Sequence, residues 1–358
     1  MASRGRGPGW RDEAAGALLL RHLPFLRLSG PVLVMEDPRS EVAEGLRGLG
    51  LEVVRWNRRA PGQEVDRRNA PAPGGLPASA WPPPGPFGAA ALRMPRSRDA
   101  LAMSLHAAWG ALETGGTLLL YGAKDEGIGS AGGVAEELFS SVGTVGVGGR
   151  CRLLQGIRRE TAPGARTTLE AWREVWAPDH PALPSRWVSY PGIFAHRQLD
   201  PGTRLLLDVL PEFSTGARIL DYGCGSGILG AAALRRQPGA TVHLLDVDAV
   251  ALEAARENVP GAELILADGL DPIPSDSYDA VITNPPFHRG KEEDPGMLAE
   301  MIRGGRRILC PGGVLTLVTQ RRIRLEKIME ESFSKVSVLA QDSVFSVWHG
   351  QRPRKTFP

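Results

Sequence analysis

Cysteine and long apolar runs are scarce in this sequence, and its positive and negative charges nearly cancel. The three cysteines, Cys151, Cys224 and Cys310, lie far apart and form no Cys-x-x-Cys pair, which argues against a zinc site and a disulfide framework. No apolar stretch approaches the length of a membrane-spanning helix. We therefore expect a protein of a reducing compartment, normally the cytoplasm, with no bound metal and no membrane association.

The N-terminus gives little sign of a targeting segment. Several arginines precede an Ala- and Leu-rich run at residues 14–20, but Asp12 and Glu13 interrupt the basic region. No small-residue cleavage site follows that run. The sequence thus predicts no secretory leader, and it leaves an organelle transit segment open.

The formal net charge is only +2, so total charge does not by itself indicate a nucleic-acid-binding protein. The arginines are nevertheless clustered in predicted loops and strand ends, where guanidinium groups can meet phosphates. The clusters are Arg55, Arg58, Arg59, Arg67 and Arg68; Arg93, Arg96 and Arg98; Arg150, Arg152, Arg158 and Arg159; and Arg321, Arg322 and Arg324. A solvated surface is the default interpretation of any one of these clusters.

The segment Asn284-Pro285-Pro286-Phe287, directly after the apolar run at 280–283, is the most informative in the sequence. Its two prolines fix φ and remove two backbone donors, so the chain leaves the predicted strand as a stiff turn with free carbonyls. The side-chain oxygen of Asn284 and the carbonyl of Pro285 can each accept one N–H from a planar amino group, while the Phe287 ring stacks on its heterocycle. The segment predicts a site for an amino group on a flat ring, although paired prolines also occur in ordinary loops.

A second motif lies upstream, where an apolar run at 217–220 is followed by Asp221, a glycine-rich turn and a helix-like segment at 228–234. The alternating glycines of the turn are Gly223, Gly225 and Gly227. A strand, a glycine turn and a helix form the place where α/β proteins bind nucleotides. A dinucleotide site has a similar spacing, but Asp221 would repel a pyrophosphate, which favours a cationic nucleoside. A purely structural turn is the alternative.

The next two predicted strands also end in carboxylates. The strand at 241–245 ends in Asp246, about 20 residues beyond the glycine turn, as expected for a carboxylate that binds a ribose diol. The strand at 263–266 leads to Asp268, which can accept the amino group of adenine, so adenosine is implied. Asp248 is interpreted as a helix N-cap. His288 is interpreted as a positioning or solvent-facing group and is not assigned to catalysis.

These strand ends, in this order, resemble the class I S-adenosylmethionine-dependent methyltransferases over roughly residues 188–350, and Asn-Pro-Pro-Phe marks the branch that methylates amino nitrogens. The segment Tyr190-Pro191-Gly192-Ile193-Phe194, followed by Leu199-Asp200-Pro201-Gly202-Thr203, is similar to the segment before the glycine turn in the ribosomal RNA guanine-N2 methyltransferases. Phe287-His288-Arg289-Gly290 also resembles that family, which includes small-subunit methyltransferase C and large-subunit methyltransferase G.

The resemblance implies an enzyme that methylates the N2 amine of a guanosine in ribosomal RNA, with S-adenosylmethionine as cofactor and ribosomal RNA or a ribosomal subunit as partner. The expected catalytic residues are Asn284, Pro285 and Phe287. The expected cofactor-binding residues are Phe194, Asp221, Gly223, Gly225, Gly227, Asp246, Asp268 and Asn284. We expect a monomer.

Other readings stay open. DNA bases and protein glutamine are alternative methyl acceptors, although those branches usually carry Asn-Pro-Pro-Tyr, where this chain has Phe287. A catalytically idle RNA-binding assembly factor is the alternative outside enzymology.

The N-terminal half suggests a degenerate second copy of the same domain, and 358 residues with 42% hydrophobic content suffice for two cores. Residues 30–35 align with 216–221, and Trp81-Pro82-Pro83-Pro84-Gly85-Pro86-Phe87 aligns with the Asn284 segment. Met35-Glu36-Asp37-Pro38-Arg39 replaces the glycine turn with a proline and bulky side chains, so the first copy should not bind the cofactor.

The predicted fold class is therefore α/β, with two tandem Rossmann-like methyltransferase domains. Residues 1–185 form the degenerate domain, which helps to recognise RNA or supports catalysis and ends in a proline-rich linker. Residues 186–358 form the catalytic domain, a seven-stranded sheet closed by an antiparallel hairpin at 335–339 and 343–348.

Overall fold

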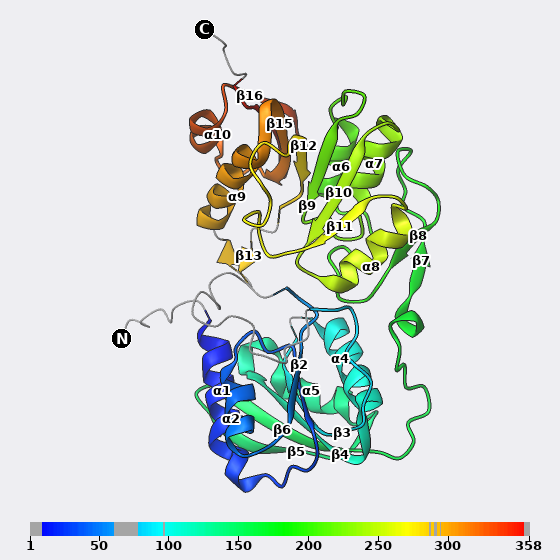
Figure 1. The fold of residues 1–358 in the computed structure, drawn as a ribbon, viewed down its shortest axis with the longest axis vertical. Helices are drawn as coiled ribbons and strands as arrows, with labels where there is room; N and C mark the ends of the chain where they lie inside the picture. The colour runs from blue at the N-terminus through cyan, green and yellow to red at the C-terminus, as the bar shows by residue number, and fades with distance from the viewer. Residues whose placement is uncertain are drawn as a thin grey trace. The chain divides into compact units, whose positions relative to one another are not determined.

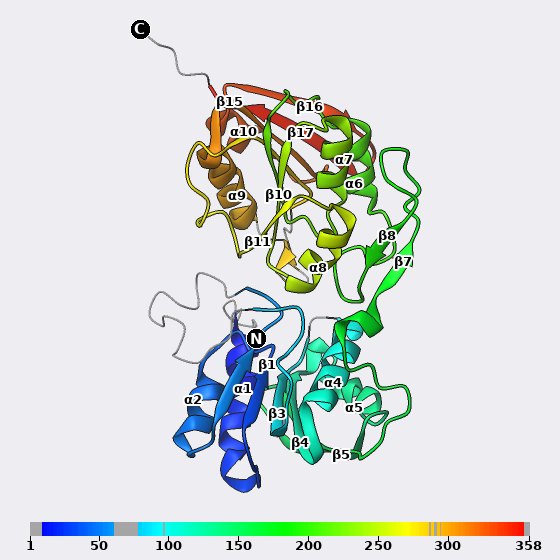
Figure 2. The same ribbon diagram turned by 45° about the vertical axis from the view of Figure 1, so that its right-hand side comes forward.

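A computed structural model describes residues 9–60, 78–95, 97–285, 288–289, 292–293 and 295–353. The chain divides into two compact units, Met1–Trp172 and Arg173–Pro358, each built on its own sheet (Figures 1 and 2). Within the described ranges, no helix combines the length and the apolar character needed to cross a membrane.

The first unit carries a six-stranded sheet in the order β2-β1-β3-β4-β6-β5. Its strands are β1 (Val32–Met35), β2 (Val53–Trp56), β3 (Phe87–Arg93), β4 (Leu112–Ala123), β5 (Phe139–Gly148) and β6 (Cys151–Arg158). Its α-helices are α1 (Trp10–His22), α2 (Glu41–Gly48), α4 (Arg98–Ala111) and α5 (Ile128–Ala135), with short 3-10 turns η1 (Leu23–Phe25), η2 (Lys124–Glu126) and η3 (Leu169–Trp172). The pairs β1–β2, β1–β3 and β3–β4 are parallel, and β4–β6 and β5–β6 are antiparallel.

The second unit carries a seven-stranded sheet in the order β11-β10-β9-β12-β15-β17-β16. Its strands are β9 (Arg218–Tyr222), β10 (Thr241–Asp246), β11 (Glu263–Leu266), β12 (Tyr278–Thr283), β15 (Leu309–Gln320), β16 (Lys335–Gln341) and β17 (Phe345–Gln351). Its helices are α6 (Pro201–Asp208), α7 (Ile228–Arg236), α8 (Ala249–Asn258), α9 (Pro295–Ile308) and α10 (Glu326–Ser332). The predicted seven-stranded sheet with a C-terminal antiparallel hairpin, β16–β17, is confirmed.

Two small ribbons complete the second unit. One pairs β7 (Glu174–Trp176) with β8 (Trp187–Ser189), and the other pairs β13 (His288–Arg289) with β14 (Glu292–Glu293). The connection between β7 and β8 contains residues 177–184, the second part of the predicted proline-rich linker, and Arg173, just before β7, donates to Glu257 on α8. This part of the linker thus belongs to the second unit.

The central strands of the second sheet are apolar because both of their faces are covered. Successive residues of β9 point to opposite faces, so Ile219 packs with the side of α6, α7 and α8, and Leu220 packs with the side of α9 and α10. Both side chains are fully buried. Figure 1 shows α9 and α10 on one side of this sheet and α6 and α7 on the other.

The two sheets have the same topology once β11 is set aside. In order, β2, β1, β3, β4, β6 and β5 of the first unit correspond to β10, β9, β12, β15, β17 and β16 of the second, with the same directions at every pair. The predicted tandem repeat is confirmed. Along the described chain, the first copy lacks a counterpart of β11.

The strand registers correct the predicted alignment of the copies. Ala89 pairs with Val32 and with Thr117, as Ala280 pairs with Ile219 and with Val314, so Ala89 corresponds to Ala280. Counting from this pair along both strands, Arg93 takes the place of Asn284.

The proposed equivalence of the Trp81–Phe87 segment with the Asn284 segment was therefore wrong. Trp81 precedes β3, at the opposite end of the strand, whereas Asn284 follows β12. Both segments contain a run of prolines, but the Trp81–Phe87 segment leads into a strand, whereas the Asn284 segment leads out of one. The same registers match Glu36, and not Asp37, to Gly223.

Candidate functional site

The glycine turn leaves the carboxyl end of β9 in a conformation that glycine favours. Gly223, Gly225 and Gly227 have φ values of 67°, 53° and 87°. A β-carbon on Gly227 would lie 2.8 Å from Val259 Cγ2, whereas one on Gly225 would meet nothing within 4 Å. Gly227 therefore allows close packing against the end of α8, and Gly225 leaves open space beside the turn.

Asp221, the last-but-one residue of β9, supplies a buried carboxylate beneath the turn. It is 1% exposed, and its Oδ2 accepts the Gly230 N–H at 2.9 Å. Its Oδ1 is buried and has no hydrogen-bond partner among the described residues. Burial, helped by the nearby charge of Asp246, raises the pKa of the Asp221 carboxyl to about 7. An unpartnered buried oxygen of this kind suits a cationic or N–H-bearing ligand, as a sulfonium amino acid would be.

Asp246 ends the neighbouring strand β10 and faces the same turn. Its Oδ2 accepts the Gly225 N–H at 2.8 Å and its Oδ1 accepts the Asp248 N–H at 2.9 Å. Asp248 is the N-cap of α8 and accepts the Val250 N–H at 3.0 Å, which confirms its predicted role. Asp246 is thus held by backbone donors at the position predicted for a ribose-binding carboxylate.

Asp268 lies exposed in the turn after β11. Tyr222 links it electrostatically to the rest of the site: burial, together with the negative charges of Asp268 and Asp246, raises the pKa of the Tyr222 hydroxyl to about 12. The predicted carboxylates at the ends of β9, β10 and β11 therefore gather at one edge of the sheet.

Asn284 follows β12, which pairs with β9 through Ile282 and Asp221. The Thr283 hydroxyl donates to the Tyr222 carbonyl at 2.7 Å, which fastens the start of the proline corner beside the start of the glycine turn. The Asn284 Nδ2 donates to Asp200 Oδ2 and to Thr203 Oγ1, both at 2.9 Å. The two predicted motifs thus lie on adjacent strands at the same edge.

For the remaining predicted residues, the structure describes fewer contacts. Pro285 is buried next to Asn284. Phe194, between β8 and α6, is 64% exposed. Phe287 lies outside the described residues, and for His288 only the backbone of β13 is described.

Sequence reasoning missed the residues that hold the glycine turn from behind. Trp187 Nε1 donates to Ser226 Oγ at 2.9 Å, and Asn258 Nδ2 donates to the Ser226 carbonyl at 3.0 Å. Asn258 also exchanges two hydrogen bonds with the backbone of Val188. No local pattern marks these partners, because 32 to 70 positions separate Asn258 from Ser226 and Val188.

Sequence reasoning also missed the partners of Asn284. Asp200 and Thr203 have a local signal, since Asp-Pro-Gly-Thr is a helix N-terminus with a capping Asp and a proline in the first turn. That signal predicts a cap for α6 but not the contact with Asn284.

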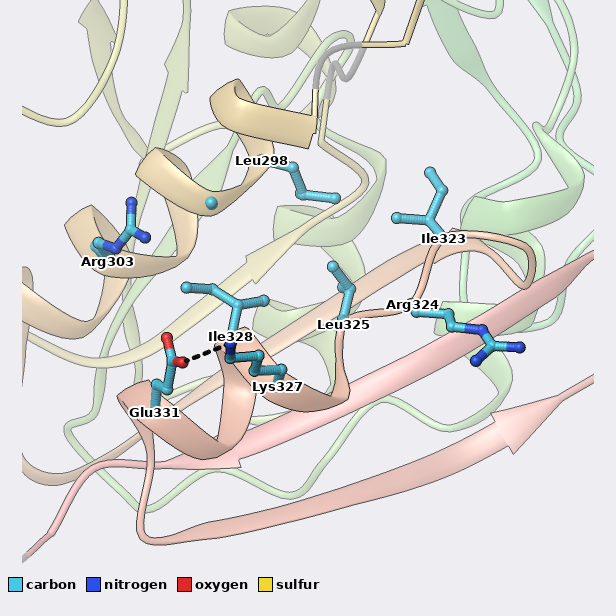
Figure 3. Close-up of a pocket in the computed structure, with 9 residues that line it drawn as sticks. Leu298, Arg303, Ile323, Arg324, Leu325, Lys327, Ile328 and Glu331 are labelled. Carbon is cyan, nitrogen blue, oxygen red and sulfur yellow. Dashed lines mark ion pairs between the residues drawn. The ribbon is translucent and has the colours of Figure 1, made fainter.

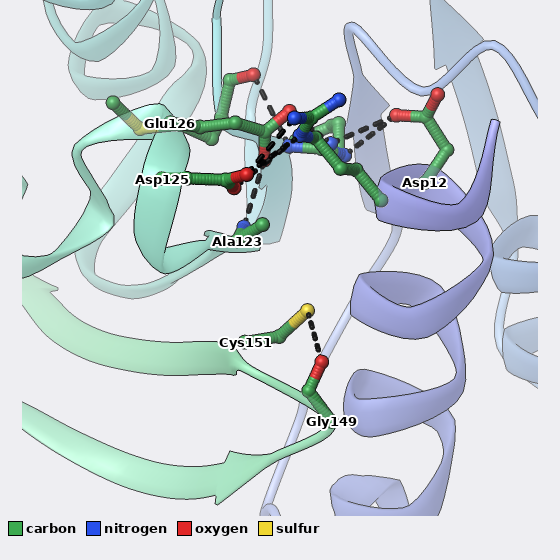
Figure 4. Close-up of polar contacts among 9 residues, drawn as sticks. Asp12, Ala123, Asp125, Glu126, Gly149 and Cys151 are labelled. Carbon is green, nitrogen blue, oxygen red and sulfur yellow. Dashed lines mark hydrogen bonds and ion pairs between the residues drawn. The ribbon is translucent and has the colours of Figure 1, made fainter. Parts of the chain in front are cut away.

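The corresponding edge of the first unit is closed by its own side chains. Arg93, which takes the place of Asn284, is 3% exposed and donates to Asp12 on α1 at 2.9 Å and to Glu126 at 2.7 Å. The Tyr121 hydroxyl donates to Asp37 Oδ2 at 2.6 Å. Figure 4 shows the side chains of Asp12, on α1, and Glu126, in η2, directed toward each other. The sequence grouped Arg93 with arginines that could meet phosphates, with a solvated surface as the default; both interpretations are wrong for Arg93, because its guanidinium is buried in ion pairs.

Elsewhere in the second unit, a groove of about 290 Å³ runs between α9, α10 and the segment after β15. Arg303 lines it from α9 and Arg324 from that segment, while Lys327 pairs with Glu331 at 3.9 Å (Figure 3). β15 runs parallel to β12, so the segment that follows it leaves the same edge that carries Asn284. Arg321, Arg322 and Arg324, which the sequence placed near this edge, are all exposed.

No three His, Cys, Asp or Glu side chains gather into a group that could hold a metal ion in the part of the chain that the structure describes. The site instead consists of a glycine turn, carboxylates and one carboxamide. This donor set suits an organic cation with hydroxyl and amino groups better than a divalent ion.

Comparison with known proteins gives the same picture. The Methyltransferase small domain family matches residues 185–349. The ribosomal RNA small subunit methyltransferase C of Hahella chejuensis is 32% identical over 346 residues, which cover 92% of this chain and 97% of that protein. The enzyme of the same name from Pseudomonas syringae pv. syringae is 34% identical over 273 residues, 75% of this chain and 80% of that one.

A solved structure extends the likeness of the fold to both units. The T. thermophilus 16S rRNA N2 G1207 methyltransferase, in complex with AdoMet and guanosine, superposes with a TM-score of 0.79 at 23% identity, over 94% of this chain and 91% of that chain. Sequence, topology and site geometry agree, and the chain belongs to the ribosomal RNA small subunit methyltransferase C family.

Proposed function

We propose that this chain transfers a methyl group from S-adenosylmethionine to the exocyclic N2 amine of a guanosine in ribosomal RNA, that of the small subunit by likeness to its relatives. The observation that carries the proposal is the position of Asn284 on the strand next to Asp221 and the glycine turn. A donor bound over the turn and an amine held by the proline corner would then be neighbours.

The cofactor fits the residues of the turn. Oδ1 of Asp221 would receive the cationic part of S-adenosylmethionine, Asp246 its ribose hydroxyls and Asp268 its adenine amine, while the open side of Gly225 allows close approach. When bound, S-adenosylmethionine supplies a methyl group that is activated by the positive charge on sulfur. Phe194, Gly223 and Gly227 complete the proposed binding set.

The chemistry asks mainly for alignment. The amine of guanine is a weak nucleophile, because its lone pair is delocalised into the ring. Asn284 Oδ1 and the Pro285 carbonyl would accept its two hydrogens, so that the nitrogen pyramidalises and directs its lone pair at the methyl carbon. The new carbon–nitrogen bond forms as the carbon–sulfur bond breaks, and the amine then releases one proton to water. Such alignment contributes up to about 7–11 kcal/mol in the best intramolecular reactions.

The base must leave its helix to reach this corner. Phe287 is proposed to stack on it, an interaction worth about 1–3 kcal/mol per base in single-stranded complexes. Arg303 and Arg324, which line the groove between α9 and α10, are proposed to contact the RNA backbone.

We propose the division of labour predicted from the sequence, with residues 186–358 catalytic and residues 1–185 supporting RNA recognition. The closed edge around Arg93 supports this division, because ion pairs occupy the place of the methyl-acceptor site. An rRNA substrate would place the enzyme where ribosomes are assembled, and we propose that it acts as a monomer.

The decisive experiment offers purified enzyme and methyl-labelled S-adenosylmethionine to ribosomal RNA, small ribosomal subunits, DNA and ribosomal protein in parallel. Digestion of the labelled product to nucleosides should give N2-methylguanosine from ribosomal RNA. Label in DNA bases or in glutamine would overturn the proposal, as would methylation of a different guanosine atom.

A further inference from the structure

The carboxamide of Asn284 is embedded in a small network at the start of α6. Asp200 Oδ2 accepts three hydrogen bonds: from the Thr203 N–H at 2.8 Å, the Thr203 hydroxyl at 3.3 Å and Asn284 Nδ2 at 2.9 Å. Thr203 Oγ1 accepts the second hydrogen of Asn284 Nδ2, also at 2.9 Å. Thr203 is buried, with 6% of its surface exposed.

The donor and acceptor roles in this network fix the orientation of the Asn284 carboxamide. An ionised carboxylate only accepts, so the group of Asn284 that faces Asp200 must be its NH2 and not its oxygen. The Thr203 hydroxyl has one hydrogen, which goes to Asp200, so its lone pairs are left for Asn284. Both Nδ2 hydrogens are therefore bound within the protein. The Oδ1 atom alone is left to meet a ligand.

We propose that Asp200 and Thr203 are positioning residues that fix the Asn284 carboxamide as an obligate acceptor. A carboxamide free to rotate would offer an NH2 donor as readily as an oxygen. With its NH2 held, it bonds a substrate that presents N–H at this point and rejects one that presents a carbonyl or ring-nitrogen acceptor, since two acceptors would then face each other. This inference rests on the proposed function and adds the basis for selecting an amine.

The first unit carries the same connection in altered form. α1 packs against β4 and β6 as α6 packs against β15 and β17, so the two helices correspond. Asp12 in the first turn of α1 bonds Arg93, the residue that takes the place of Asn284. In both units a carboxylate from the start of this helix binds the side chain at the carboxyl end of the corresponding strand. The two units thus share the contact between the start of this helix and the end of the strand, with Asn284 as the partner in one unit and Arg93 in the other.

Four substitutions, one of them a control, separate positioning from folding. Asp200→Asn keeps a good N-cap for α6 but replaces the acceptor-only carboxylate with a group that tolerates either orientation of Asn284. Thr203→Val removes the hydroxyl at nearly constant volume, and Thr203→Ser restores it. Asp208→Asn is the matched control, because it removes a charge from the far end of the same helix, where Asp208 meets His180.

We expect Asp200→Asn and Thr203→Val to lower kcat for RNA methylation roughly 10- to 100-fold, with the KM for S-adenosylmethionine unchanged. Thr203→Ser should recover most of the loss. In an Asn284→Ala background the Asp200 and Thr203 substitutions should cost nothing further, because they act only through that side chain. Equal losses in both backgrounds, or an equal loss in Asp208→Asn, would overturn the inference.

A second readout does not depend on activity. The side-chain NH2 protons of Asn284, assigned in the NMR spectrum by their absence from Asn284→Ala, should exchange slowly with water, and this protection should be lost in Asp200→Asn. Fast exchange in the unmodified enzyme would overturn the inference. If the enzyme methylates no ribosomal RNA while these protons are protected, the proposed function fails and the positioning network stands.

Discussion

At the scale of single residues, the Asn284 carboxamide is the group on which transfer depends. Asn284→Ala removes the acceptor for the substrate amine without touching the glycine turn. We expect turnover to fall at least about 100-fold, while the affinity for S-adenosylmethionine stays near that of the unmodified enzyme. Labelled methyl transfer and calorimetric titration measure the two quantities. Unchanged turnover would remove the carboxamide from the mechanism.

The buried carboxyl of Asp221 makes a pH dependence measurable. Its pKa in the folded protein is about 7, well above the ordinary 3.8. Between these values the folded chain holds a proton that the unfolded chain has released, so stability falls as pH rises and this loss is complete above pH 7.

A cation bound at Oδ1 favours the ionised carboxyl, so cofactor binding should expel that proton. The affinity for S-adenosylmethionine should therefore rise with pH up to about 7 and then level off, with a slope approaching roughly tenfold per pH unit well below the pKa. Asp221→Asn provides the comparison that cancels titration of the cofactor itself. A slope shared by both proteins would contradict the assignment.

The side chains whose place at the edge of the sheet could be predicted from the sequence are those with a local signature. Asp221, Asp246 and Asn284 each stand at the carboxyl end of an apolar strand, and parallel strands bring these ends to one edge. Asp200 escaped prediction because 84 positions separate it from Asn284, and a capping pattern says nothing about what else the cap will bind.

At the scale of elements, the glycine turn gives a comparison of two similar substitutions. Gly225→Ala and Gly227→Ala both place a β-carbon at positive φ, a strain of roughly 1–2 kcal/mol. Only the second also drives that carbon to 2.8 Å from Val259. Gly227→Ala should therefore lower the free energy of unfolding by more than Gly225→Ala, as urea denaturation of the cofactor-free protein can measure.

Gly225→Ala should instead act mainly on the ligand, because its new methyl group enters open space beside the turn. Its affinity for S-adenosylmethionine should fall with little further loss of stability. Equal destabilisation by the two substitutions would mean that the end of α8 does not restrict the turn.

The elements of the second sheet were predictable because buried parallel strands are short apolar runs and the final hairpin alternates with period two. The alignment of the copies was not. Prolines occur both where strands begin and where they end, so a run of prolines does not identify one end of a strand. The pairing of Ala89 and Ala280 with their neighbouring strands shows that Arg93 is the counterpart of Asn284.

At the scale of the whole molecule, two similar units should have one cofactor site. Glu36 stands where the second unit has Gly223, and Asp12, Arg93 and Glu126 fill the edge beside it. Calorimetry should give a stoichiometry of one S-adenosylmethionine per chain, and Asp246→Ala should abolish the binding heat. A second binding event that survives Asp246→Ala would place a site in the first unit.

The groove between α9 and α10 is expected to contribute charge to RNA binding. Replacing both Arg303 and Arg324 with alanine should raise the KM for RNA and reduce the dependence of log K on log salt by roughly one per lost phosphate contact. Arg235→Ala is the control, since that exposed arginine lies in the last turn of α7, which runs away from the catalytic edge. Identical salt slopes in all three proteins would exclude the groove from the RNA path.

One oxygen atom, Oδ2 of Asp200, both caps the first turn of α6 and restrains Asn284. Unwinding of that single turn would therefore release the amide while every strand of the sheet is still paired. On warming, methyl transfer should therefore be lost through this local unwinding at a temperature some degrees below the midpoint of global unfolding.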